Sequence, residues 1–179
     1  ELVALAPPQA AELLDPLQDA EAATVLSMLS PAVAEDIMLA MGEERRKTVI
    51  AAAPLADANQ WTANFTYPDG SVGRLMEPPR AVFRPELTVA QTIERIRELV
   101  KNVFVTYGFV VDSAGVLLGD LAMRDLLLAN KDASIESVML LKPFALAPEL
   151  DAIEAMKLVV NHHFPVYPVC DSTGRLGNL

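Results

Sequence analysis

A repeat of short apolar helices most constrains what the first third of this chain can fold into. Leu5-Ala6-Pro7 and the residues behind it match Leu29-Ser30-Pro31 and the residues behind it, 24 positions later. In each copy a proline stands where it suits the first turn of a helix, and Ser30 is a favourable N-cap for the second copy. Short helices of this kind cannot each bury a face alone, so the pattern predicts a stacked helical array over residues 1–66. An ordinary helical bundle stays open as the alternative.

The pattern changes after Tyr67–Gly70, whose residues are typical of a turn. Apolar spacing predicts helices over residues 89–99 and 152–161, which follow Thr88 and Asp151, both good N-caps. Each helix is followed by an apolar run and an Asp-x-x-Gly turn, which indicates a β-hairpin. The order strand, helix, strand, strand, helix is therefore predicted to occur twice.

The two repeats divide the chain into an acidic helical domain (1–66), a linker (67–75) and two βαββα units (76–136 and 137–179). The expected fold class is α+β multidomain, with a superhelical α-helical domain first. In the second βαββα unit the return strand is shorter than in the first, and the chain ends before a closing helix. We therefore expect this unit to be truncated, with its missing strand and helix supplied from elsewhere.

Acidic side chains are concentrated in the helical domain. The chain has 14 Lys and Arg against 24 Asp and Glu, a formal net charge of −10, and residues 1–60 hold ten of the acids and three of the bases. This balance disfavours electrostatic binding to nucleic acid or to anionic lipid, and it fits a protein that binds cations. A solvated helix face explains the same acidity without a metal, and both explanations stay open.

Cysteine usage and hydropathy exclude several further classes of protein. The single cysteine, Cys170, rules out a disulfide framework and a cysteine-rich zinc site and favours a reducing compartment. No apolar stretch approaches the ~18 residues that cross a bilayer. The chain opens at Glu1 without a basic leader, so we expect a piece of a longer protein that lacks a signal peptide. Common nucleophile, phosphate-loop and zinc-protease motifs do not occur, so we expect no enzyme activity.

The combination of the two repeats resembles a known family. The βαββα pair from Met76 onward is similar to tandem cystathionine-β-synthase (CBS) domains, and the helical repeat before it is similar to the N domain of MgtE-type magnesium transporters. The resemblance is carried by the order of the modules, a Tyr-x-x-x-Ser-x-Gly-Arg-Leu-Met junction from Tyr67, and the segment Leu121–Leu127. In that family the N and CBS domains lie in the cytosol below a dimeric transmembrane channel, and Mg²⁺ bound between the domains holds the pore closed.

The resemblance implies a cytosolic Mg²⁺-sensing region that gates a magnesium transporter through ion-bridged docking of the N domain on the CBS pair. The implied partners are a second copy of the chain, through the helices that start at Thr88 and Asp151, and a transmembrane pore domain of the same full-length chain, but not nucleic acid. The implied location is the cytoplasmic side of the cell membrane. The alternative is a soluble CBS-domain sensor of adenine nucleotides that regulates a partner protein. The residues that follow Leu179 would separate the two.

The resemblance also implies weak, regulatory Mg²⁺ sites. Glu12 and Asp36 fall at acidic positions that the family uses for bridging ions, and Glu35 is the neighbour of Asp36. Asp151 matches another acidic site, although its role as a helix N-cap already gives it a structural reason to be there. The chain departs from the family at His163, where a metal-binding Asp is common. Because Mg²⁺ prefers oxygen donors, a histidine there would weaken or delete one site, or invite a softer ion.

A second implied ligand is ATP or another adenine nucleotide in the cleft between the CBS units. Asp125 falls where CBS domains place an acid on the ribose hydroxyls, and Arg124 is placed to meet phosphate. Tyr107 and Phe164 fall where aromatic rings would sandwich the adenine. Ala122 stands where a hydroxyl residue is expected, and losing that contact costs about 1 kcal/mol. The alternative is that Arg124 and Asp125 only start a helix while the two rings belong to the core.

Overall fold

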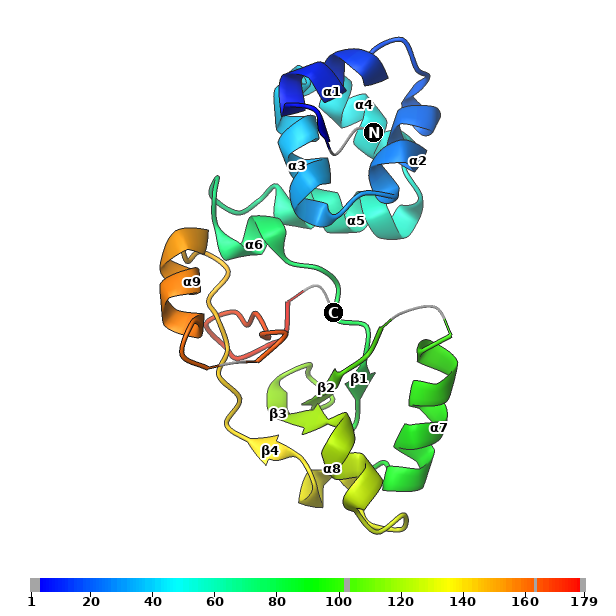
Figure 1. Ribbon diagram of the computed structural model, residues 1–179, viewed down its shortest axis with the longest axis vertical. Coiled ribbons are helices and arrows are strands. Elements are labelled where there is room, and N and C mark those ends of the chain that lie inside the picture. Colours follow the sequence, from blue (N-terminus) through cyan, green and yellow to red (C-terminus); the bar gives the residue numbers. More distant parts are fainter. Residues whose placement is uncertain (1–3, 102–103, 163, 178–179) are drawn as a thin grey trace. The chain divides into compact units, whose positions relative to one another are not determined.

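The chain divides into two compact units between Glu77 and Pro78 in a computed structural model (Figure 1). The structure describes residues 4–101, 104–162 and 164–177. The first unit is helical and the second combines helices with a sheet, which confirms the mixed fold class predicted from the sequence. None of the helices within the described ranges has the length and apolar character that a membrane span requires.

The first unit is a stack of short helices whose packing follows the sequence repeat. Its main helices are α1 (Pro7–Leu14), α2 (Asp19–Ser27), α3 (Pro31–Ala40), α4 (Glu43–Ala52) and α5 (Leu55–Asn64). The starts of α1 and α3 lie 24 residues apart, as do those of α2 and α4, and each of these pairs packs together. Small buried side chains such as Ala10, Ala22 and Ala34 let the helices approach closely. Ser30 occupies the N-cap position of α3, but its side chain makes no capping hydrogen bond.

The segment 67–75, expected as a linker, packs onto the first unit. It contains a short helix, α6 (Val72–Leu75), which contacts α3 and α5. Asn64 of α5 donates from Nδ2 to the backbone carbonyls of Arg74 and Met76, each at 3.0 Å. Because these hydrogen bonds satisfy the backbone of the segment, the compact unit extends to Glu77 instead of ending near residue 66.

The second unit is built on a sheet with the strand order β1-β2-β3-β4. β1 and β2 are parallel, and the other neighbours are antiparallel. The described elements run strand, helix, strand, strand, helix, as predicted for the first βαββα unit. In chain order they are β1 (Val82–Phe83), α7 (Val89–Leu99), β2 (Tyr107–Val111), β3 (Leu117–Ala122) and α8 (Met123–Leu128), followed by a 3₁₀ turn (Ile135–Ser137), β4 (Leu140–Leu141) and α9 (Ala152–Val159).

Local side-chain hydrogen bonds fix the predicted caps and turns. Thr88 Oγ1 accepts from the backbone N–H of Gln91 at 3.2 Å, and Asp151 Oδ1 accepts from two N–H groups of α9, so both predicted N-caps are confirmed. Asp112 Oδ1 accepts from the backbone of Ala114 and Val116 in the β2–β3 turn. Asp171 accepts from Thr173 and Arg175 in the same way. Each turn closes at a glycine with positive φ, Gly115 at 83° and Gly174 at 82°.

The second βαββα unit forms short pairings within the described residues. Leu146 pairs with Val169 in parallel, and Cys170 pairs with Leu176 in antiparallel fashion. These bridges repeat the parallel and antiparallel order of β1, β2 and β3. Helix α9 ends at Val159, two residues before the predicted end. It starts after the predicted N-cap, Asp151, and the predicted turn at Asp171 follows it in the chain.

A glycine in β3 generates a test of the sheet. A Cβ atom at Gly119 would lie 2.7 Å from the carbonyl oxygen of Leu140, so β4 would have to move. We predict that Gly119→Ala lowers the free energy of unfolding of the second unit by about 1–3 kcal/mol, measured by urea denaturation followed by circular dichroism. Gly42→Ala, whose Cβ meets no atom within 4 Å, is the control and should change it by less than about 1 kcal/mol. Equal midpoints for wild type and Gly119→Ala would contradict the described β3–β4 pairing.

Candidate functional site

Glu12 lies on the wall of a groove in the first unit. The groove has a volume of about 240 Å³ and is lined at the end of α1 by Glu12 and Asp15 and at the α3–α4 turn by Gly42 and its neighbours. Arg45 also lines it, but its guanidinium forms an ion pair with Asp19 and donates from Nη2 to the carbonyl of Leu17 at 2.5 Å. Because Asp19 already neutralises this arginine, Glu12 and Asp15 give the groove its negative charge.

The adjacent acids of α3 lie in different surroundings. Asp36 is exposed, whereas only 7% of Glu35 is exposed. Successive residues of a helix point about 100° apart, so one of two neighbours reaches solvent while the other faces the protein. Glu35 therefore cannot share with Asp36 an ion that approaches from solvent.

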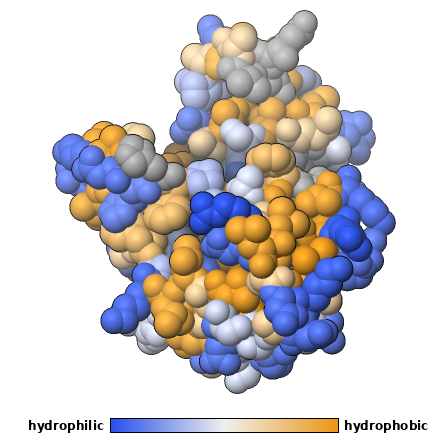
Figure 2. All heavy atoms as spheres, turned by 60° about the horizontal axis from the view of Figure 1, so that its bottom comes forward, coloured by the Kyte–Doolittle hydropathy of each residue, from blue (hydrophilic) through white to orange (hydrophobic). Residues whose placement is uncertain are grey.

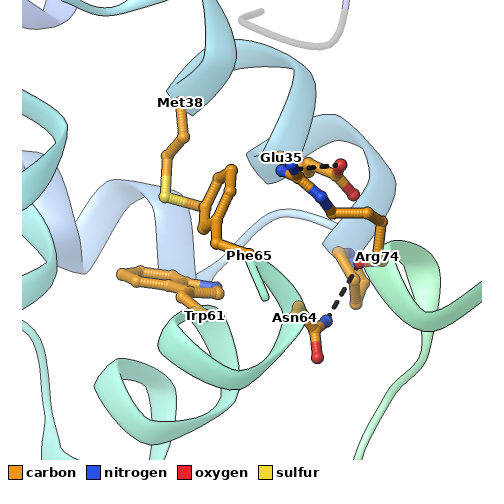
Figure 3. A pocket seen from close by; sticks show the side chains of 7 residues that line it. Glu35, Met38, Trp61, Asn64, Phe65 and Arg74 are labelled. Atoms are coloured by element: carbon orange, nitrogen blue, oxygen red, sulfur yellow. Dashed lines mark hydrogen bonds and ion pairs between the residues drawn. The ribbon is translucent and has the colours of Figure 1, made fainter. Parts of the chain in front are cut away.

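Glu35 instead faces Arg74, which comes from the junction after α5 (Figure 3). Arg74 Nη1 lies 3.6 Å from Glu35 Oε1, and Arg74 Nε donates to the carbonyl of Tyr67 at 2.8 Å. Arg74 also pairs with Asp69, and its guanidinium carbon lies 4.6 Å from the ring centroid of Phe65. These contacts tie the junction to α3 and α5 through one cation.

Burial is the main influence on Glu35. It raises the pKa of this carboxyl above its ordinary value, the Arg74 guanidinium lowers it, and the negative charges of Asp36 and Asp69 raise it further. Glu35 Oε2 and Arg74 Nη1 are buried without a hydrogen-bond partner among the described residues. The pair therefore holds position at a cost in desolvation, and removing one partner would leave an uncompensated charge.

The remaining metal expectations concern the second unit. Asp151 is exposed, and both of its described hydrogen bonds use Oδ1. His163 lies outside the described residues. Within the described ranges, no three His, Cys, Asp or Glu side chains converge on one point. Glu12, Asp36 and Asp151 are thus exposed oxygen donors, and the described residues form no closed metal cage.

The residues expected to hold a nucleotide lie around one end of β2 and β3. The rings of Tyr107 and Phe164 have centroids 6.0 Å apart and stand at 88° to one another. In this edge-to-face arrangement they do not form the pair of parallel faces that would sandwich an adenine. Asp125 lies in the first turn of α8, where Arg124 Nε contacts its Oδ1 at 3.1 Å. The structure therefore brings an aromatic pair and an acid–base pair to the same unit.

Other proteins resemble this chain in sequence and in structure. No family model matches it. The magnesium transporter MgtE of Thermus thermophilus is 31% identical over 111 residues, which are 62% of this chain and 25% of the transporter. The chain thus spans about a quarter of the length of this curated relative.

The structural matches extend over more of the chain. One match is the cytosolic domain of the Mg²⁺ channel MgtE, solved in complex with ATP. The matched region covers 98% of this chain and 72% of the MgtE chain, with a TM-score of 0.86 and 26% identity. The chain resembles the cytosolic region of an MgtE-type magnesium transporter. A second match is the CBS pair domain of a putative Mg²⁺ transporter from Shewanella oneidensis MR-1. The matched region covers 84% of this chain and 88% of the Shewanella chain, with a TM-score of 0.63 and 18% identity, and this match supports the fold alone. The sequence-based recognition of an N domain followed by CBS units is confirmed.

Sequence reasoning missed Tyr167, which organises the aromatic residues of the CBS pair. Its hydroxyl donates to the carbonyl of Val159 and accepts from the backbone N–H of Phe164, each at 3.1 Å. Its ring lies 6.1 Å from that of Phe164 and 6.2 Å from that of Phe144, which stacks on His162 at 4.1 Å. The aromatic residues near Pro165 were the available signal in the sequence. Their spacing does not show which rings contact one another.

Asp120 in β3 was also missed. Its Oδ1 is buried without a hydrogen-bond partner among the described residues, and burial raises the pKa of this carboxyl to about 6. The carboxyl of Asp120 also influences the pKa of the Cys170 thiol. Burial first, and then the carboxylates of Asp171 and Asp120, raise the pKa of this thiol to about 11, which disfavours the reactive thiolate form at neutral pH.

The Arg74–Glu35 pair generates a stability prediction for the N domain. Arg74→Met should destabilise the domain by about 3 kcal/mol at pH 8, because Glu35 stays buried without its cation. Loss of the cation raises the pKa of Glu35 further, so the penalty is present above that pKa and disappears as pH falls toward the unfolded value. Urea denaturation at pH 8 and pH 5 measures the difference.

The double variant Arg74→Met with Glu35→Gln is the matched control. It removes both charges, so it should recover part of the lost stability and show little dependence on pH. A single variant as stable at pH 8 as at pH 5 would contradict the described pair.

Proposed function

We propose that the chain is the Mg²⁺-sensing regulatory region of a magnesium transporter, located at the cytoplasmic side of the cell membrane and joined to a transmembrane pore domain. Bound Mg²⁺ bridges the N domain and the CBS pair and favours the closed pore. The observation that supports this proposal best is the exposure of Glu12 and Asp36 on the packed pair of helices α1 and α3. The relatives described above are transporter and CBS-domain proteins and not enzymes.

Elementary electrostatics explains why such a region responds to a divalent cation. The acidic groups outnumber the basic ones in the whole chain by 24 to 14, and acidic surfaces repel one another. A divalent ion between two such surfaces replaces this repulsion with attraction. Mg²⁺ keeps several waters and is satisfied by one or two carboxylates, so exposed single acids suit a weak sensor better than a closed cage would.

The individual donors fit this role to different degrees. Glu12 and Asp36 are the proposed ligands of the N domain, and Asp151 is the proposed ligand of the CBS pair through the carboxylate oxygen that does not cap α9. Glu35 was predicted with them, but its contact with Arg74 gives it the task of fixing α3. The proposed ligand set therefore keeps one of the two adjacent acids.

A scattering titration tests the sensor. We predict that Mg²⁺, raised from chelator to tens of millimolar, lowers the radius of gyration of the chain beyond matched ionic-strength controls. Glu12→Gln with Asp36→Asn should raise the midpoint of this change by about tenfold or more, because bridging oxygens are lost.

Glu43→Gln with Glu44→Gln is the matched control, since it removes two exposed charges of the same domain that face Lys47. The control should keep the wild-type midpoint, because exposed ion pairs contribute little. Equal midpoints in both double variants would refute the ligand assignment, and a wild-type chain that responds only to ionic strength would refute Mg²⁺ sensing.

Adenine-nucleotide binding is the second proposed function, either within the transporter or in a separate sensor of this type. Tyr107, Phe164, Arg124 and Asp125 lie in one compact unit, and the similar cytosolic domain of MgtE was solved in complex with ATP. Aromatic faces supply stacking, Asp125 accepts from ribose hydroxyls, and Arg124 meets phosphate. Rotation of Phe164 would be needed to sandwich a base.

We further propose that the chain forms a homodimer through its CBS domains. The face of α9 exposes Ile153 by 61%, Met156 by 62% and the adjoining Val160 by 65%, which is the spacing of one helical stripe. Figure 2 shows apolar side chains gathered on one face of the molecule. Helix α8 also exposes Leu127 by 78% and Leu128 by 81%. A stripe of this kind is covered in an isologous dimer by the same stripe of the second copy.

A charge placed in the stripe tests the dimer. Met156→Glu should raise the dissociation constant by roughly thirtyfold or more, because a central apolar contact becomes a buried charge. Light scattering over a range of concentrations measures it, with Glu154→Gln on the neighbouring polar side of α9 as the control. A wild-type chain that stays monomeric at high concentration would refute the proposal.

A further inference from the structure

Asp120 lies where the two CBS units of the chain meet. It stands in β3, and the strand register sets it opposite Phe109 of β2 and Leu140 of β4. Residues directly opposite one another share a face of the sheet. On this face Phe109 packs against a cluster that contains Cys170 and Leu176, which belong to the second βαββα unit. The carboxyl of Asp120 therefore lies on the side of β3 that the second βαββα unit covers.

The immediate surroundings of this carboxyl disfavour a negative charge. Its Oδ1 is enclosed and has no hydrogen-bond partner among the described residues, although the side chain as a whole is half-buried. The residues opposite it, Phe109 and Leu140, are apolar. Burial without a hydrogen bond or a counter-charge penalises the ionised form of a carboxyl far more than the neutral form. The position in the sheet therefore favours the protonated form of Asp120.

The titratable groups around Asp120 supply no positive charge to it. From the second βαββα unit come the thiol of Cys170 and, beside it, the carboxyl of Asp171. In α8, which contacts β3, Arg124 and Asp125 pair with each other. Among the residues that the structure describes, none of the ion pairs includes Asp120. Burial accordingly raises the pKa of this carboxyl from its ordinary value of 3.8 to about 6.

Protonation of Asp120 and contact between the two βαββα units are linked through this burial. Separation of the units would let water reach the carboxylate, whose pKa would return toward 3.8. The closed arrangement therefore binds the proton more tightly than the separated one, and a ligand with unequal affinity for two arrangements shifts their populations. We propose that Asp120 makes this contact sensitive to pH, so that protonation of its carboxyl tightens the contact and ionisation loosens it. The inference goes beyond the proposed sensing of Mg²⁺ and nucleotides, because neither ligand takes part in it.

The direction of the effect follows from the raised pKa. Below about pH 4 the carboxyl is protonated in both arrangements, so the contact has its full strength. As pH rises from about 4 to about 6, the separated arrangement ionises while the closed one stays protonated, and the contact weakens. Above the pKa of the closed arrangement both are ionised and the loss is complete. Between pH 5 and pH 7.5 this difference in pKa corresponds to a weakening of about tenfold.

Cys170 is a built-in reporter of this contact. It is the only cysteine in the chain and is 9% exposed, so a thiol reagent reaches it after the contact opens. Labelling with dithiodipyridine, which reacts at acid and at neutral pH, gives one rate for the folded chain and one for the urea-unfolded chain. The ratio of the second rate to the first, in which the pH dependence of the thiol reaction itself cancels, is the protection of Cys170. We expect this protection to fall about tenfold between pH 5 and pH 7.5.

Asp120→Asn tests the assignment with almost no change in shape. An amide neither gains nor loses a proton between these pH values, so the protection of Cys170 in this variant should change by less than about twofold. Asp132→Asn is the matched control, because it removes an exposed carboxyl of the same CBS unit. This control should keep the tenfold fall of the wild type.

Two results would overturn the proposal. One is a wild-type protection that is equal at pH 5 and pH 7.5, and the other is a tenfold fall that Asp120→Asn retains. If Asp120→Asn does not fold, carbon NMR of the wild-type Asp120 carboxyl decides in its place, since a titration midpoint above about pH 5 supports the proposal and a lower midpoint overturns it. Neither Mg²⁺ nor nucleotide is present in these measurements, so their failure and that of the proposed function are distinguishable.

Discussion

The guanidinium of Arg74 is the contact on which the N domain depends for its shape. One cation joins a carboxylate of α3, a carbonyl and a carboxylate of the junction, and the ring of Phe65 at the end of α5. Together with the hydrogen bonds from Asn64 to the carbonyls of Arg74 and Met76, this contact holds the segment between Phe65 and Met76 on the domain, and the compact unit ends at Glu77. The Gly-Arg-Leu-Met sequence therefore completes the packing of the N domain, in addition to connecting it to the second unit.

The Arg74 contact also bears on helix α3, which carries a proposed Mg²⁺ ligand. Glu35 and Asp36 are adjacent on α3, and the same turn of helix carries the buried partner of Arg74 and a proposed Mg²⁺ ligand. Because Glu35 is held from inside, the position of Asp36 follows from that of the junction. A ligand that binds Asp36 better in one arrangement of the chain than in another shifts the population of those arrangements by its differential affinity alone. Weak binding is no obstacle, since a tenfold difference in affinity corresponds to about 1.4 kcal/mol whatever the absolute affinity is.

What the sequence predicted well depends on short-range chemistry. The caps at Thr88 and Asp151 and the turns at Asp112 and Asp171 use hydrogen bonds between residues two to four positions apart, so a sequence pattern contains all of their atoms. The repeat of α1 and α3 was equally readable, because a proline at the start of each and the offset of 24 residues mark these two helices, which pack together, as copies. The resemblance to the transporter family supplied the order of the domains, which local patterns do not contain.

What it could not predict depends on pairs that are distant along the chain. Glu35 and Arg74 meet across 39 positions, and nothing near Glu35 marks it as the buried member of an acidic pair. The alternation of β3 places Asp120 on a face, but whether that face meets water or the second CBS unit is decided by Cys170, which is 50 residues away. Both carboxylates owe their burial to segments that are distant along the chain, so no local pattern marks either of them.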